Sequence, residues 1–156
     1  MVTTEALRQC ELFSELEDAE LELIVPLCRE RTYGPGEIIC VAEEEADELF
    51  ILQEGQVSLH IKLSSVVERS GAMTIDALEP GRIFGWSSIV KQQRFTATAR
   101  ASQPARVLAI QASGLQRLFD RNMHIGFVVM KQLANVISSR LRRTRLELEE
   151  KAWAGG

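Results

Sequence analysis

Hydrophobic and polar positions divide the chain into two helical stretches separated by a long series of short strands. In residues 21–28 the apolar positions recur at the spacing of an α-helix. Between about residues 32 and 110, short apolar runs and alternating stretches are separated by Gly and Pro turns, which is typical of strands. From residue 123 no proline follows and only Gly126 interrupts up to about residue 151, which predicts one long helix.

The strand pattern is clearest in residues 94–101. Phe95, Ala97, Ala99 and Ala101 alternate with polar side chains, so they are expected to share one face of a strand. Many short strands joined by such turns predict a mainly β fold with flanking helices, either a sandwich, a roll or a barrel. We expect an N-terminal helical segment and β-roll in residues 1–122. A hinge and the long helix follow in residues 123–153, and residues 154–156 form a disordered tail.

Composition narrows the function classes. The length of 156 residues suits one domain, and the net charge of −4 provides no general attraction to nucleic acid or to an anionic membrane. Three scattered cysteines do not form a disulfide framework, and no signal peptide or membrane span is present, so we expect a cytoplasmic protein. The two histidines, His60 and His124, do not suggest a metal site, and no nucleophile motif is complete. These features predict a binding or regulatory domain rather than an enzyme.

The turn residues form an ordered series along the chain. The series is Pro35-Gly36-Glu37, Ala46 to Ile51, Gly55-Gln56-Val57, Leu78 to Gly85, and Thr96 to Ala101. In this order and spacing they resemble the cyclic-nucleotide-binding domain of the catabolite-activator and redox-regulator superfamily. The resemblance covers about residues 10 to 145. It implies a jelly-roll-like double-stranded β-helix with a long C-terminal helix, and a pocket for a cyclic nucleotide.

The resemblance also implies which residues would line that pocket. They are Phe84, Gly85, Trp86, Ser87, Ser88, Arg94, Phe95, Thr96, Ala97 and, on the long helix, Thr144. Family members hold the ribose with a glutamate directly after the glycine, where this chain has Trp86. They pair the phosphate with an arginine just before Ser/Thr-Ala, where this chain has Phe95, with Arg94 one residue earlier. Glu43 stands where members commonly have a turn glycine.

Three interpretations of this altered pocket remain open. The two aromatic rings could fill it and leave a structural or protein-interaction module. The pocket could instead take a different aromatic or apolar ligand, with Ser87, Ser88 and Thr96 as its polar contacts. Alternatively, it could still bind a cyclic nucleotide if a bulge turned Arg94 inward. The only expected cofactor is therefore a cyclic nucleotide or another small ligand. Thr144 would contact that ligand or be an ordinary exposed threonine.

The long helix predicts a homodimer, because an amphipathic helix of this length commonly buries its apolar stripe against a second copy. The stripe is expected to contain Val129, Leu133, Val136, Ile137, Leu141 and Leu148. Packing of the same stripe against the roll of its own chain is the alternative. The basic residues 140–145 are followed by glutamates and are expected to form a solvated face. The chain ends where related transcription factors continue into a helix-turn-helix module, so direct DNA binding is not expected, and a separate output protein is compatible with the sequence.

Overall fold

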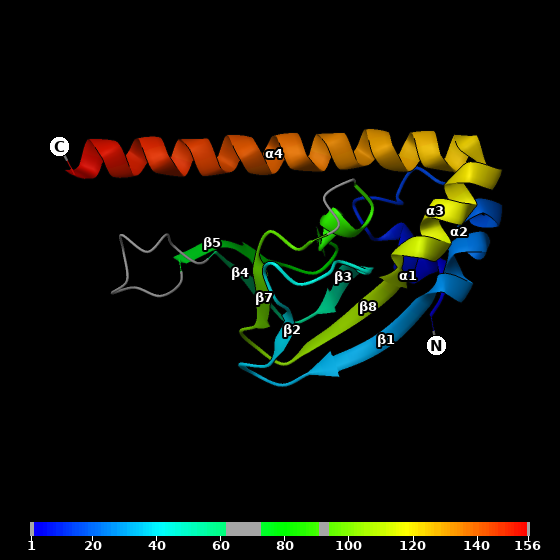
Figure 1. Cartoon of the computed structure of the whole chain (residues 1–156), viewed down its shortest axis with the longest axis horizontal. Coiled ribbons are helices and arrows are strands. Elements are labelled where there is room, and N and C mark those ends of the chain that lie inside the picture. Colours follow the sequence, from blue (N-terminus) through cyan, green and yellow to red (C-terminus); the bar gives the residue numbers. More distant parts are fainter. Residues whose placement is uncertain (1, 62–72, 91–93, 156) are drawn as a thin grey trace.

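The computed structural model describes residues 2–61, 73–90 and 94–155, and it contains two antiparallel sheets with helices on one side (Figure 1). The strands are β1 (Cys28–Tyr33), β2 (Ile38–Cys40), β3 (Glu48–Glu54), β4 (Val57–Ile61), β5 (Met73–Leu78), β6 (Ile83–Phe84), β7 (Thr98–Ala101) and β8 (Ala105–Gln111). The helices are α1 (Thr4–Arg8), α2 (Asp18–Ile24), α3 (Ala112–Arg121) and α4 (Met123–Gly155), with 3₁₀ turns η1 (Val25–Leu27) and η3 (Trp86–Ser88). The predicted mainly β architecture with flanking helices is confirmed.

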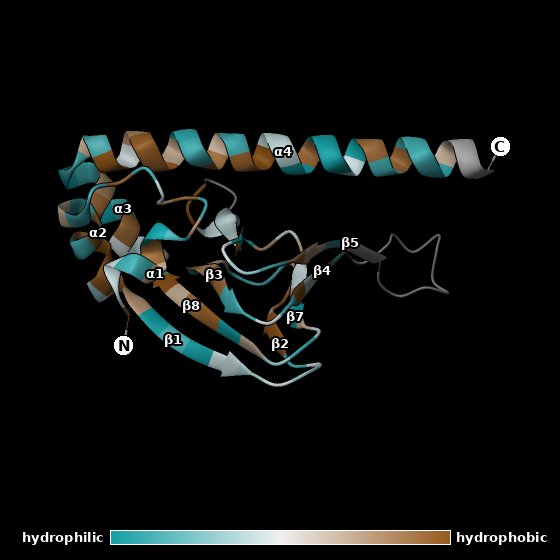
Figure 2. Cartoon of the chain, turned by 180° about the vertical axis from the view of Figure 1, so that it is seen from behind, coloured by the Kyte–Doolittle hydropathy of each residue, from teal (hydrophilic) through white to brown (hydrophobic). Residues whose placement is uncertain are grey.

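The two sheets enclose the interior of the β-roll. One sheet has the strand order β1-β8-β3-β6 and the other has the order β2-β7-β4-β5, so neighbours are mostly far apart in sequence. The first sheet is buried on both faces in its central strands: along β3, Leu49 and Ile51 pack against the helices, while Phe50 and Leu52 pack inside the roll. This double burial explains the continuous apolar run of β3. Figure 2 shows the contrast between hydrophobic β8 and the largely hydrophilic edge strand β1.

Strand β7 is shorter than the alternating sequence predicted. It begins at Thr98, and Arg94 before it forms only an isolated bridge with Glu45. The predicted alternation of burial holds at both ends of the segment, because Phe95, Ala99 and Ala101 are buried whereas Thr96 and Arg100 are exposed. It is lost between them, where Ala97 and Thr98 are both half-buried.

Helix α4 begins in the same hydrophobic core as the helices α1 and α2. Ile125, Val129, Leu133 and Val136 are buried there, so three residues that the sequence predicted at a dimer interface pack on their own domain instead. The helix then extends past β5 (Figure 1) and continues to Gly155. The prediction of a disordered tail from residue 154 is therefore wrong for residues 154 and 155, whose backbone is helical.

Gly55, in the turn between β3 and β4, should be the least replaceable of the turn glycines. Its φ is +90°, and a Cβ there would lie 2.1 Å from the Pro104 carbonyl oxygen. We expect Gly55→Ala to lower the free energy of unfolding by about 3 kcal/mol in urea denaturation, because backbone strain and a backbone clash combine. Gly36→Ala is the control, since Gly36 has a similar φ of +87° with nothing within 4 Å of the added Cβ. Equal losses in both variants would contradict this explanation.

Candidate ligand pocket

A left-handed glycine and a short 3₁₀ turn follow β6 at residues 85–88. Gly85 adopts a left-handed φ of +75°, and a Cβ at this position would lie 2.9 Å from the ring of Phe50. Residues Trp86–Ser88 then form the short turn η3, which the Ser88 hydroxyl supports by donating to the Gly85 carbonyl at 2.8 Å. The Phe-Gly turn is therefore formed with the local geometry that its sequence indicates.

Aromatic side chains fill most of the space beneath this turn. The ring centroids of Phe50 and Phe84 lie 5.0 Å apart, and those of Phe50 and Phe95 lie 6.2 Å apart. A hollow of about 70 Å³ remains, lined by Cys40, Leu59, Phe84, Gly85, Trp86, Ser87, Phe95, Thr96 and Ala97. Small-molecule sites usually measure about 300–1,000 Å³. The hollow is therefore much smaller than a site that encloses a nucleotide.

Seven of the ten residues predicted for the pocket line this hollow. Ser88 lies instead on a larger groove of about 860 Å³ on the other side of η3, between β1, the start of β3 and α3. The charges of this groove have both signs, among them Arg31 and Glu48, which pair through two hydrogen bonds of 2.8 Å. The groove therefore favours no single ligand charge. Thr144 is exposed on α4, outside the hollow.

Arg94 is turned outward and already has a partner. Its guanidinium Nη1 donates to the carbonyl oxygen of Glu43 at 2.6 Å, and the side chain is exposed. Glu43 has a φ of +73°, a left-handed conformation that glycine adopts more readily. Backbone hydrogen bonds from Glu43 to Phe95 and from Phe95 to Glu44 hold this turn. Arg94 is thus engaged in supporting the turn and does not line the hollow.

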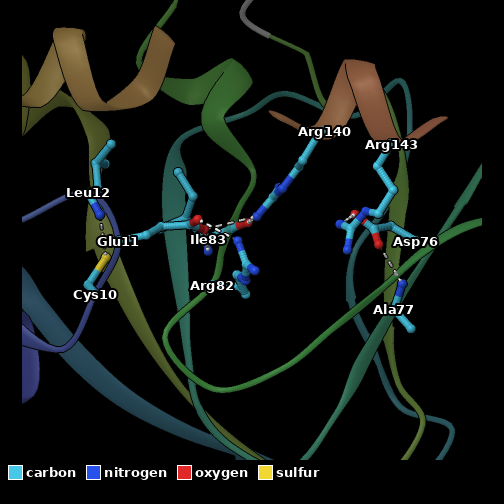
Figure 3. Close-up of polar contacts among 9 residues, drawn as sticks. All are labelled: Cys10, Glu11, Leu12, Asp76, Ala77, Arg82, Ile83, Arg140 and Arg143. Carbon is cyan, nitrogen blue, oxygen red and sulfur yellow. Dashed lines mark hydrogen bonds and ion pairs between the residues drawn. The ribbon is translucent and has the colours of Figure 1, made fainter. Parts of the chain in front are cut away.

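A charged residue outside the predicted pocket set lies beside the pocket wall. The guanidinium carbon of Arg140, on α4, lies 4.7 Å from the centre of the Trp86 ring. Arg140 also reaches Glu11 at 3.1 Å and the main-chain carbonyl of Ile83 (Figure 3). Burial lowers the pKa of Arg140, and the neighbouring Glu11 and Asp76 oppose that effect. The basic run in residues 140–145 is the available sequence signal, although its pattern favours a solvated face.

The described residues contain no cluster suited to a metal ion. No group of three or more His, Cys, Asp or Glu side chains converges among them. The three cysteines are free, and burial raises the pKa of Cys10 to about 12 and that of Cys40 to about 11. Neutral thiols of this kind are poor metal ligands and poor nucleophiles. Within residues 2–61, 73–90 and 94–155, no helix has the length and apolarity needed to cross a membrane.

Comparison with known proteins establishes the class of this domain. Residues 30–122 match the sequence profile of the family described as "Cyclic nucleotide-binding domain". The fold superimposes with a TM-score of 0.78 on a protein of Geobacter metallireducens GS-15 assigned as a cyclic nucleotide-binding protein. The two chains are 33% identical, and the alignment covers 90% of this chain and 99% of the other. The chain therefore belongs to the cyclic nucleotide-binding domain family.

Two longer proteins contain a similar segment. One is the cyclic nucleotide-gated potassium channel mll3241 of Mesorhizobium japonicum, 29% identical over 120 residues. The other is glutaminase 2 of Bradyrhizobium diazoefficiens, 29% identical over 130 residues. The alignments cover 77% and 83% of this chain, but only 31% of the channel and 19% of the glutaminase. The shared segment is thus a minor part of each longer protein, and their activities are not transferred with it.

Proposed function

We propose that this chain is a non-enzymatic regulatory domain whose nucleotide pocket is filled by its own aromatic side chains, and that it acts through protein contacts in the cytoplasm. The observation that carries the proposal is the hollow of about 70 Å³ left beneath η3. Phe95 is 6% exposed and occupies the position from which family members extend the phosphate arginine. Trp86 occupies the position of the glutamate that holds the ribose in family members. Both anchors and most of the volume are therefore missing.

The energetic consequence is large compared with ordinary ligand affinities. A charge-assisted hydrogen bond contributes about 1.5–3 kcal/mol, so the two bonds of an arginine fork contribute about 3–6 kcal/mol. This loss corresponds to about 10²- to 10⁴-fold in affinity. A cyclic nucleotide would also have to displace Phe95 from its packing against Phe50. Arg94 does not compensate, because its guanidinium is held by the Glu43 carbonyl.

Calorimetric titration with cyclic AMP and cyclic GMP tests this proposal. We expect no measurable binding at micromolar nucleotide, because neither the phosphate nor the ribose has its charged partner in the hollow. Intrinsic fluorescence of Trp86 provides a second measurement, with a Trp153→Phe variant to remove the other tryptophan. A dissociation constant in the low micromolar range for either nucleotide would refute the filled pocket.

The protein contact that we propose is a homodimer through α4, but along a different stripe from the predicted one. A series of residues on α4 alternates spacings of four and three, which is the heptad spacing of a coiled coil. We call this series the outer seam: Met123, Phe127, Met130, Ala134, Ile137, Leu141, Thr144 and Leu148. It retains Ile137, Leu141 and Leu148 from the predicted stripe and places Thr144 among apolar neighbours.

The outer seam lies roughly a third of a turn around the helix from the face that packs on the roll, at 3.6 residues per turn. Several of its large side chains are exposed in the single chain, with Phe127 67% exposed and Leu141 68% exposed, whereas Ile137 is half-buried against the core of its own domain. An exposed apolar row at heptad spacing is typical of a helix that pairs with another helix. A second copy supplies an identical row, so self-association needs no additional partner.

A further inference from the structure

Helix α4 changes its mode of attachment to the β-roll at Arg140. Up to Val136 the helix is held by buried apolar side chains, namely Ile125, Val129, Leu133 and Val136. Among residues 137–152, Arg140 is the only buried residue, and every described side chain after it is exposed. Beyond Arg140, the described contacts with the roll include the ion pair of Arg143 with Asp76 at 2.8 Å. Arg140 is therefore the last buried anchor of the helix.

The roll offers a preformed site for this guanidinium (Figure 3). Glu11 accepts the Ile83 main-chain N–H at 2.9 Å and pairs with Arg82 at 3.1 Å, so its carboxylate is fixed without any contribution from α4. Arg140 Nη2 then donates to Glu11 at 3.1 Å and to the Ile83 carbonyl. The ring of Trp86 covers the guanidinium at 4.7 Å. An anion, a carbonyl and an aromatic face thus converge on one cation.

The contacts of Arg140 differ in kind from a surface ion pair. Its side chain is only 9% exposed, whereas those of Arg143 and Asp76 are 46% and 14% exposed. Exposed pairs contribute little to stability, but removing one partner of a buried charge pair is costly because the other is left without compensation. Cation–π contacts strengthen when they are shielded from water. Trp86 is also a wall residue of the hollow, so the anchor joins the pocket wall directly to α4.

We propose that Arg140 acts as a built-in ligand of the β-roll, which keeps the second half of α4 docked without any bound small molecule. Trp86 then contacts the helix through Arg140 instead of contacting a nucleotide. As a consequence, the outer seam is presented continuously and is not exposed by a ligand. This inference goes beyond the proposed function, because α4 can be anchored in this way whether the hollow binds a molecule or stays empty.

Amide hydrogen exchange of the full chain tests the anchor. Arg140→Met removes the charge but keeps much of the unbranched stem, and Arg142→Met makes the same change at an exposed neighbouring position. We expect exchange at residues 137–143 to become at least about tenfold faster in Arg140→Met and to remain unchanged in Arg142→Met, because local opening governs exchange. Equal protection in the two variants would overturn the proposal. Both variants are compared at concentrations where light scattering gives the same oligomeric state.

Two further measurements separate the anchor from a general loss of folding. Trp86→Leu retains an apolar side chain but removes the aromatic face, and it should accelerate exchange in the same segment while protection of β3 and β8 persists. In the unmodified chain, the segment should be protected without nucleotide and unaffected by excess cyclic AMP. If Trp86→Leu changed nothing, or if protection appeared only after cyclic AMP was added, α4 would not be held by this built-in contact.

Discussion

The double variant Trp86→Glu/Phe95→Arg is expected to bind cyclic AMP about 10²- to 10⁴-fold more tightly than the unmodified chain. Replacement of Phe95 removes the ring that packs on Phe50 and places a planar fork of donors at the pocket wall beside Thr96 and Ala97. Replacement of Trp86 provides the carboxylate that family members use for the ribose. Because the Gly85 turn and η3 are already formed, the new side chains would enter an existing backbone frame.

The matched control is Trp86→Leu/Phe95→Leu, which opens space without adding charge. Calorimetric titration of both variants distinguishes the effect of added pocket volume on affinity from the effect of the charged contacts, because only the charged variant can pair with phosphate and ribose. If the leucine control bound as tightly as the charged variant, the lost anchors would not be what limits affinity. Thermal melts should accompany the titration, since a buried arginine without its anion lowers stability and ligand should restore it.

Leu141→Glu is expected to weaken the proposed homodimer strongly. Leu141 lies in the C-terminal half of the outer seam and is its most exposed leucine, and a glutamate there would bring two like charges together in an apolar contact. We expect the dimer dissociation constant to rise by about 100-fold or more, which sedimentation velocity over a concentration series would measure.

The control for this prediction is Leu146→Glu. Leu146 is a comparably exposed leucine on the same helix, at 51%, but it lies away from the outer seam. Loss of dimer in both variants would indicate that charge alone disfavours association, and persistence of dimer in Leu141→Glu would exclude the outer seam. A chain that is monomeric before any substitution would contradict the proposal directly.

Much of the fold could be predicted from the sequence because the signals for turns are local. Gly36, Gly55, Gly81 and Gly85 all adopt positive φ, and each stands in a turn that its neighbours already indicated. The alternation around Phe95 likewise followed from strand geometry alone. Part of the site was predictable for the same reason. The residues on either side of Gly85 and the two that follow Phe95 line one hollow, as their place in the motif order implied.

The helix faces were harder to predict for a physical reason. Helix α4 carries two apolar faces, and periodicity identifies apolar positions without saying which partner each face meets. The buried positions of Val129, Leu133 and Val136 became evident only when the helix was seen against α1, α2 and the outer side of β3. The helix also extends further than its glycine-rich end suggested, to Gly155.

The sequence by itself determined the β-roll, its turns and the replacement of both nucleotide anchors, because these depend on residue type and on short-range spacing. Only the tertiary structure decided that the aromatic rings fill the pocket. It also decided that Arg140 is buried in contact with Trp86, Glu11 and Ile83. Those contacts join residues 54, 129 and 57 positions apart in the chain. Burial of a charge depends on neighbours that only folding brings together, which is why a run of arginines in the sequence resembled a solvated surface.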